Sequence, residues 1–341
     1  MAARAWLPVV AAWACLLPLA PSALAQASAA APVSEARAWL ARIHEAARRG
    51  NYRGTMVFAA GAAISSSRVW HYCVGDMTYE RIEALDGRQQ RIYRVNDEVH
   101  TVWPEMRVAV VERRDALLPV PTTPQAVDPV ALTNYELKLE AGPARVAGRD
   151  AVVFTLEPRD ELRFAQRLWA DRATGLMLRA DVLGPGAGAA RVVLESAAFS
   201  EIEIGIKPPA DAHALAVPRL EGYRVQRPQA QRTQLEAEGW TLVRPPVGFT
   251  LTGCVKRPLE MPSDGAGGSE PVLQATFTDG LAHVSLFIEP HSARRPRSEM
   301  HAHQGATTTV VVRRHDHWIT VVGDAPAATL KQLAGALERR R

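Results

Sequence analysis

VVFTLEP (152–158), RFAQRLWADRATGLMLRADVL (163–183) and RVVLESAAF (191–199) are three extended segments separated by turn residues. From 176 to 182 the even-numbered residues are apolar, and the charged Arg179 and Asp181 lie between them. A period of two predicts a strand with one face in water. Residues 171–175 are the predicted turn, because Asp and Thr bond their own backbone and glycine adopts positive φ. Residues 168–170 and 176–178 should therefore pair as an antiparallel hairpin within a meander.

Residues 1–25 are predicted to be a signal peptide. They combine the basic Arg4, an apolar run at 7–20 and the small-residue sequence Ala23-Leu24-Ala25. The run is too short and too interrupted by proline to span a bilayer, although an uncleaved anchor is the alternative. We therefore expect a mature chain that begins near Gln26 and is exported, most simply to a bacterial periplasm.

Net charge bears on the class of partner, and the cysteine content bears on disulfide formation. The formal net charge of +4 is too small to indicate nucleic acid. Cys73 and Cys254 remain after cleavage, and in an oxidising compartment they could form a disulfide. Two packed free thiols are the preferred interpretation, and the disulfide is the alternative.

Residues 32–207 are predicted to form a large first domain. A helix over 32–49, with Ser34 as its predicted N-cap, carries an apolar stripe that includes Trp39. Short strands separated by turns follow between 55 and 103, which favours an antiparallel sheet. The proline-rich segment 117–130 interrupts the meander, because proline cannot donate a hydrogen bond to a strand ladder.

Residues 208–232 are predicted to be a linker, since they carry prolines and polar residues with little periodicity. Residues 233–341 are predicted to be a smaller α+β domain, in which Thr278-Asp279-Gly280 forms a hairpin turn. Its final helix should be capped by Asp324 and bury a stripe of Leu330, Leu333, Ala334 and Leu337.

Six passages, taken in order, resemble the RseB/MucB family of periplasmic regulators of the envelope-stress sigma factor (sigma-E or AlgU). In the first domain they are WLARIHEAARRGNYRGTMVF (39–58), RIEALDGRQQRIYRVNDEV (81–99) and LWADRATGLMLRADVL (168–183). In the second they are PPVGFTLTGCVKRPLE (245–260), FTDGLAHVSLFIE (277–289) and TVVVRRHDHWITVVGDAPAATLKQLA (309–334). Each passage alone is weakly specific, but their succession covers essentially the whole mature chain.

The resemblance implies a fold and a function. The fold is mostly β with α+β: an antiparallel half-barrel around a helix, similar to the lipoprotein carriers LolA and LolB, followed by a smaller C-terminal α+β domain. The implied function is to bind the periplasmic part of a transmembrane anti-sigma factor of the RseA or MucA type and to protect it from regulated proteolysis. Release would follow the binding of a lipid, lipoprotein or lipopolysaccharide ligand.

The residues themselves favour a binding protein over an enzyme. The chain contains no GxSxG, HExxH or P-loop motif, and no GxGxxG after a strand. The metal candidates are a group of histidines, at positions 291, 301, 303, 315 and 317. No carboxylate or cysteine ligand set accompanies them, so polar loop histidines are the preferred interpretation. We therefore expect no catalytic residue, cofactor or metal site.

Two surfaces are candidates for binding. A concave sheet could hold an acyl chain against aromatic residues, for which the candidates are Trp70, Tyr72, Trp103, Tyr135, Phe154 and Trp169. The alternative is that these residues fill the core. Contacts to the anti-sigma factor are expected from basic residues of the second domain, for which the candidates are Arg244, Lys256, Arg257, Arg294, Arg295 and Arg297. A solvated surface is the alternative there.

Three hypotheses follow. The first is a regulatory binding protein whose affinity for the anti-sigma factor falls when an amphiphile binds. The second is a lipid or lipoprotein carrier, which would need no second domain. The third is an exported hydrolase, for which no residue is a candidate nucleophile. Formation of a homo-oligomer is a further possibility under each of these hypotheses.

Overall fold

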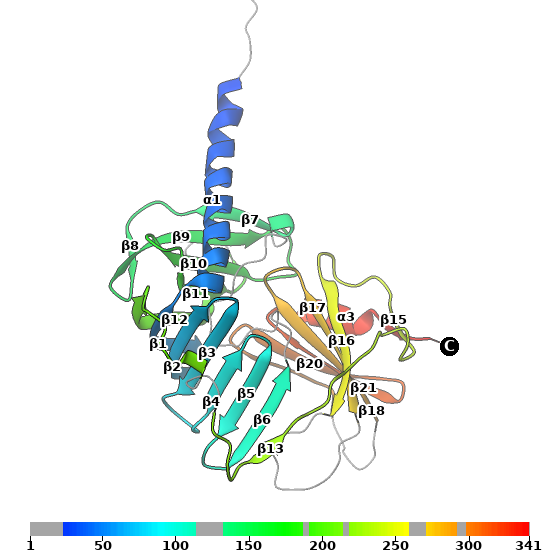
Figure 1. Cartoon of the computed structure of the whole chain (residues 1–341). Coiled ribbons are helices and arrows are strands. Elements are labelled where there is room, and N and C mark those ends of the chain that lie inside the picture. The colour runs from blue at the N-terminus through cyan, green and yellow to red at the C-terminus, as the bar shows by residue number, and fades with distance from the viewer. Residues whose placement is uncertain are drawn as a thin grey trace, which may run out of the picture.

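The computed structural model describes residues 23–113, 132–186, 191–213, 218–258, 271–291 and 298–340. Most of the expected signal peptide, the proline-rich segment 117–130 and the three arginines Arg294, Arg295 and Arg297 lie outside these residues. Two units built on separate sheets lie side by side, the larger from the first two thirds of the chain and the smaller from the last third (Figure 1).

Helix α1 (Ala23–Arg49) starts before the predicted residue 32, so Ser34 lies inside the helix and is not its N-cap. The preceding sequence is rich in alanine, the residue with the highest helix propensity, which explains the earlier start. The helix ends as predicted, and the backbone N–H of Gly50 donates to the Ala46 carbonyl at 2.8 Å. One face of α1 packs on the larger sheet through Trp39, Leu40 and Ile43, which are buried.

The larger sheet joins two antiparallel meanders. In the described part of the chain its thirteen strands are ordered β13-β6-β5-β4-β3-β2-β1-β12-β11-β10-β9-β7, with β8 paired to β9. Because β1 pairs with both β2 and β12, it connects the two meanders into one bent sheet (Figure 1). The strands are β1 (Tyr52–Ala60), β2 (Ala63–Val74), β3 (Met77–Ala84), β4 (Arg91–Val95), β5 (Glu98–Trp103), β6 (Val108–Arg113), β7 (Tyr135–Leu139), β8 (Ala144–Val146), β9 (Arg149–Pro158), β10 (Ala165–Asp171), β11 (Met177–Leu183), β12 (Val193–Ile204) and β13 (Arg224–Gln226).

The predicted hairpin is present between β10 and β11, but its register differs from the predicted one: residues 168–170 pair with 177–180, with Leu168 opposite Ala180 and a shift of register after Trp169. Asp171 closes its turn, because Oδ2 accepts hydrogen bonds from the Thr174 N–H at 2.9 Å and hydroxyl at 2.7 Å. Gly175 has φ of 82°, a conformation that favours glycine. Asp181 differs from the prediction: it is buried rather than wetted, because Arg179 and Ser196 both donate to its carboxylate.

The segment predicted as a linker carries strands of both sheets. β13 pairs in parallel with β6, and β14 (Gln231–Arg232) pairs with β16 of the smaller unit. Ahead of β13, residues 206–213 and 218–223 lie on the outer face of the larger sheet, where Ala212 packs on Tyr72 and Leu220 packs near Tyr93. The chain therefore passes from one sheet to the other within residues 227–230.

The smaller unit is a seven-stranded antiparallel sheet with one helix across it, in the described residues. The sheet order is β14-β16-β17-β18-β21-β20-β19, and a separate pair joins β15 to β22. The elements are β15 (Trp240–Leu242), β16 (Thr250–Pro258), β17 (Pro271–Thr278), β18 (His283–Pro290), β19 (Met300–Gln304), β20 (Thr307–Arg314), β21 (His317–Gly323), α3 (Ala327–Gly335) and β22 (Leu337–Arg339).

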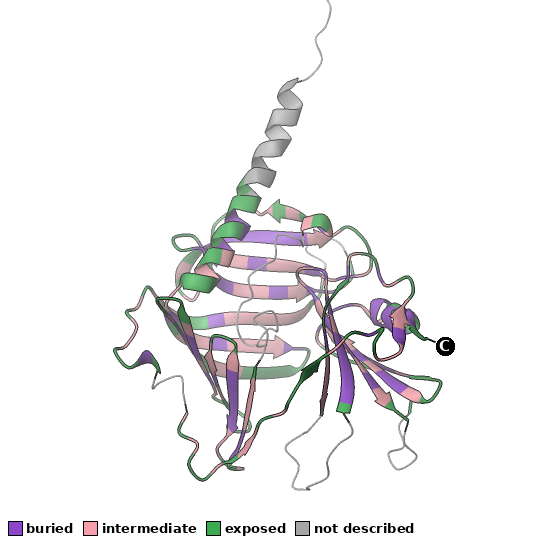
Figure 2. Cartoon of the chain, turned by 45° about the vertical axis from the view of Figure 1, so that its right-hand side comes forward, coloured by how far each residue is buried: buried purple, intermediate pink, exposed green. Residues whose placement is uncertain are grey.

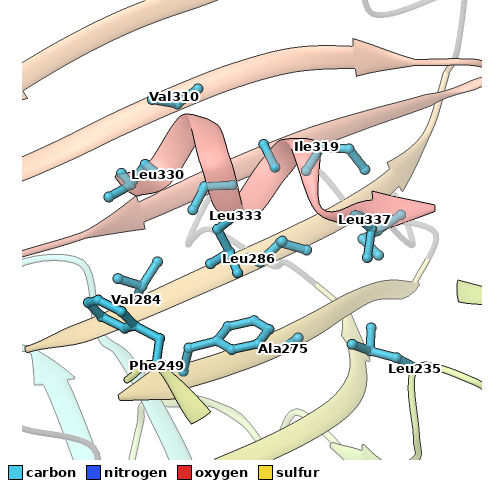
Figure 3. Close-up of a cluster of buried hydrophobic side chains, with 14 of the residues drawn as sticks. Leu235, Phe249, Ala275, Val284, Leu286, Val310, Ile319, Leu330, Leu333 and Leu337 are labelled. Carbon is cyan, nitrogen blue, oxygen red and sulfur yellow. The ribbon is translucent and has the colours of Figure 1, made fainter. Parts of the chain in front are cut away.

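Helix α3 covers the apolar face of this sheet. Leu330 and Leu333 lie over Leu286, Val310 and Ile319 (Figure 3). Two expectations about this helix were wrong. Leu337 belongs to β22, and Asp324 is not the cap, since Pro326 holds that position without a side-chain hydrogen bond.

The fold class predicted from the sequence is confirmed: a large, mostly antiparallel sheet that packs on a helix, and a smaller α+β unit. Buried residues concentrate between α1 and the sheet and beneath α3 (Figure 2). Within the described residues, no helix is both long and apolar enough to cross a membrane.

Candidate functional site

The two units meet where the β17–β18 turn of the smaller unit reaches the core of the larger one. Leu281 at this turn packs against the apolar cluster that includes Trp39 and Phe154. The preceding Asp279 has a fully buried side chain. We call this contact, formed by residues 279–282 against the larger unit, the turn contact.

A buried ion pair holds the turn contact. Nε of Arg163, which follows β9, donates to Asp279 Oδ2 at 2.7 Å, and the Tyr135 hydroxyl donates to the same oxygen at 3.0 Å. Both charged side chains are at most 1% exposed. Burial, and then the Asp279 charge, raise the pKa of Tyr135, so its hydroxyl keeps the proton that it donates.

The local sequence explains why Asp279 can serve both units. Its other oxygen, Oδ1, accepts the backbone N–H of Leu281 at 3.0 Å and of Ala282 at 2.7 Å, which closes the Asp-Gly turn. Oδ2 is thereby left for Arg163 and Tyr135. Arg163 also donates through Nη2 to the Val247 carbonyl at 2.8 Å, which ties the loop before β16 to the same point.

A second contact joins β12 to the β19–β20 turn. Glu195 Oε1 accepts the backbone N–H of Ala306 at 3.1 Å and of Thr307 at 3.3 Å. We call this the carboxylate contact. Two further bonds lie along the junction: Thr329 Oγ1 donates to the Leu162 carbonyl at 2.7 Å, and Arg257 pairs with Glu112 at 3.6 Å.

The six candidate aromatic residues do not line one cavity. Phe154 and Tyr135 lie in the core beneath α1. Trp70 and Tyr72 lie on the opposite face of the sheet, under residues 206–212. Trp169 also points away from α1, because its neighbours Leu168 and Ala170 face the helix, and Arg179 stacks on it at 4.5 Å. Trp103, at the end of β5, is half-buried.

The described basic candidates have different surroundings. Lys256 donates to Glu238 at 2.8 Å, and Arg257 forms the interdomain pair described above. Arg244 is exposed. Its loop also carries exposed apolar side chains, at Val243 (38%), Val247 (75%) and Leu251 (41%). We call residues 243–251 the junction loop, because Arg163 holds it at the junction.

The thiols and histidines are accounted for separately. Cys73 and Cys254 are free thiols, and burial raises the pKa of Cys254 to about 11. His301 and His303 lie on the exposed strand β19. The described residues contain no group of three His, Cys, Asp or Glu side chains placed to hold a metal ion.

Sequence reasoning missed the residues that make the junction. Residues 278–280 were identified only as a hairpin turn, and nothing in the pattern singled out Arg163 or Glu195. The available signal was weak: an Asp-Gly turn has one carboxylate oxygen to spare, and that oxygen needs a partner if the turn is buried.

The comparisons with known proteins agree with this two-unit architecture. The family model of the MucB/RseB N-terminal domain matches residues 35–219, and that of the MucB/RseB C-terminal domain matches residues 234–338. The chain belongs to the MucB/RseB family. The sigma factor AlgU regulatory protein MucB of Pseudomonas aeruginosa is 31% identical over 314 residues, which cover 89% of this chain and 91% of that protein. The sigma-E factor regulatory protein RseB of Haemophilus influenzae is 25% identical over 94% of this chain and 97% of that protein.

Solved structures of MucB share the fold with this MucB/RseB family member. The Pseudomonas aeruginosa MucA/MucB complex superposes with a TM-score of 0.67 at 29% identity, covering 90% of this chain and 99% of that chain. MucB in complex with MucA(peri) gives 0.65 at 28% identity, again covering 90% and 99%.

Proposed function

We propose that this chain is a periplasmic regulatory protein of a sigma-factor pathway, not an enzyme. It binds the periplasmic part of a transmembrane anti-sigma factor of the MucA or RseA type, shields that segment from regulated proteolysis and releases it when a lipid-like ligand binds. The supporting observation is the near full-length likeness to MucB, which has been solved in complex with MucA.

The junction loop is the proposed docking surface for the anti-sigma factor. It combines the cationic Arg244 with exposed apolar side chains, of which Val247 is 75% exposed. Partner surfaces commonly combine apolar anchors with arginine. Because Arg163 binds the Val247 carbonyl, a change at the turn contact would also move this loop.

The apolar cluster beneath α1 is the proposed entry point for an acyl chain. Burial of each methylene group of such a chain contributes about 0.8 kcal/mol to the free energy of binding. Tyr135 belongs to this cluster and also donates to Asp279. An acyl chain that displaces Tyr135 would therefore remove a hydrogen bond from the turn contact. Such a ligand weakens partner binding only to the extent that it binds the partner-free protein more tightly than the protein in complex with its partner.

Partner binding is tested by titrating a purified MucA-type periplasmic segment into the full mature chain. Val247→Asp should weaken binding by at least about fivefold, because it places a carboxylate in an apolar contact. Ile64→Asp is the matched control, since Ile64 is an apolar residue on β2 with a similar exposure of 73%. Equal effects of the two substitutions, or no binding by the wild type, would overturn this part.

Release is tested by adding lysophosphatidylcholine below its micelle concentration to the preformed complex. We expect the affinity for the segment to fall, whereas the deacylated headgroup glycerophosphocholine should have no effect. Unchanged affinity with the acylated ligand would refute lipid-triggered release and leave partner binding intact.

A further inference from the structure

The carboxylate contact contains a second acid besides Glu195. Thr307 Oγ1 lies 3.3 Å from Glu195 Oε1 and 3.0 Å from Asp324 Oδ1. Glu195 belongs to β12 of the larger unit, whereas Thr307 and Asp324 belong to the smaller unit. One hydroxyl group therefore bridges two carboxylates across the junction.

The hydrogen count of this bridge decides what it can bind. A threonine hydroxyl has one hydrogen, so it can donate to only one of the two carboxylates. If both are ionised, the other contact brings two acceptor oxygens together without a hydrogen between them. If one carboxyl is protonated, Asp324 donates to Thr307 and Thr307 donates to Glu195, so that every contact in the chain is a hydrogen bond.

We propose that Glu195, Thr307 and Asp324 form a proton-binding site that fastens the smaller unit to the larger one. The site takes up a single proton from solvent as the junction closes and returns it as the junction opens. It belongs to the junction itself and is independent of what the chain binds.

The surroundings favour the protonated form. Burial, and then the charge of Asp324, raise the pKa of Glu195, and burial raises the pKa of Asp324. Opposite Glu195, β1 and β11 place the uncharged Ala60 and Val182. His283 of β18 faces Asp324 and Asp279, but burial lowers its pKa, which favours the neutral imidazole over a compensating charge.

Gly305 allows the β19–β20 turn to approach Glu195 closely. Gly305 has φ of 60°, and a Cβ at this residue would lie 2.5 Å from Glu195 Cγ. A side chain here would therefore push the turn away from Glu195. The glycine permits the two backbone N–H groups and the Thr307 hydroxyl to reach the same carboxylate oxygen.

The sign of the pH effect follows from linkage. A carboxyl whose pKa is raised when the junction is closed binds more protons in that state than in the open one. Closing is therefore favoured as the pH falls through the raised pKa, and the junction loosens as the pH rises above it. His283 acts in the opposite sense, because its lowered pKa favours the closed state at higher pH.

The test is hydrogen exchange of the 305–308 peptide in the full mature chain, corrected for the intrinsic pH dependence of exchange. In the wild type the opening constant of this turn should rise about tenfold between about pH 5 and about pH 8. In Thr307→Val, which keeps the shape and both backbone amides, the midpoint of this dependence should move to higher pH, because the Thr307 hydroxyl lowers the pKa of both carboxyls that burial raises. Thr307→Ser should restore the wild-type midpoint. Because His283 is present in the wild type and in both variants, its effect cancels when their profiles are compared.

Glu195→Gln and Asp324→Asn give a second measurement that does not depend on the valine variant folding. Each removes one titrating group and should flatten the pH profile of the turn, while the exchange of the 279–282 turn keeps its wild-type profile. A wild-type profile that is flat, or one that is unchanged in Thr307→Val and in both amide variants, would overturn the proposal.

Discussion

Asp279 and Arg163 are the single residues whose separate loss should cost the most stability. Each is buried with the other as its charged partner, and removing one leaves a buried charge without its buried partner, although Arg163 keeps an ion pair with the partly exposed Asp160. Asp279→Asn should lower the free energy of unfolding by about 3–5 kcal/mol, measured by urea denaturation.

The control for this substitution is a solvent-exposed ion pair of the same protein. Arg145 and Asp150 lie 3.6 Å apart with side-chain exposures of 69% and 75%. Asp150→Asn should leave the denaturation midpoint nearly unchanged, because exposed pairs contribute little. Equal shifts for the two variants would show that the turn contact does not hold the units together.

Two glycines with similar backbone conformations allow the cost of close packing to be measured separately from the cost of backbone strain. Gly305 and Gly75 have nearly the same φ, 60° and 59°, but an added Cβ meets Glu195 at the first and nothing within 4 Å at the second. Gly75→Ala should cost about 1 kcal/mol, the strain of a left-handed residue. Gly305→Ala should cost more and should speed hydrogen exchange at Thr307. Equal losses would contradict the tight fit at Glu195.

At this scale the sequence could predict the turns but not their partners. Asp-Gly at 279 and the turn closed by Asp171 were both predicted, because their hydrogen bonds are local. Arg163 lies 116 residues from Asp279 along the chain, and no short-range pattern relates them. The same is true of Glu195 and Thr307, which are 112 residues apart.

Among the elements, α1 should stabilise the larger unit through a single apolar face. Ile43 is fully buried there, whereas Arg37 is exposed on the same helix. Ile43→Ala should lower the free energy of unfolding by about 2–5 kcal/mol, by loss of buried area and creation of a cavity. Arg37→Ala should have little effect, and an equal loss would mean that α1 is not packed as described.

The strands were easier to predict than the faces that they present. The β10–β11 hairpin was predicted from alternation and turn residues, and it is present. Alternation assigns residues to the two faces of a strand, but it does not show what covers each face. Asp181 keeps the predicted face beside Arg179, and its burial, which was not foreseen, comes from the Arg179 and Ser196 side chains. The outward position of Trp169 and the separation of the six aromatic residues were not foreseen either.

For the molecule as a whole, the order of the two units could be predicted and their attachment could not. Composition marks residues 208–232 as poor in periodicity, yet β13 and β14 within it extend both sheets. Each of these strands is two or three residues long. Strands of that length carry no readable period, since alternation needs at least four residues.

The junction makes a last prediction about cooperativity. Each unit has its own apolar core, so each could unfold separately if nothing joined them. The turn and carboxylate contacts oppose this, because opening the junction exposes the buried Asp279 pair and frees the Glu195 acceptor. In calorimetry the wild type should therefore unfold in one transition, with equal calorimetric and van't Hoff enthalpies. Combining Asp279→Asn with Glu195→Ala should divide it into two. A wild type that already shows two transitions would mean that these contacts are too weak to couple the units, and the pH dependence of the carboxylate contact would then be confined to the β19–β20 turn.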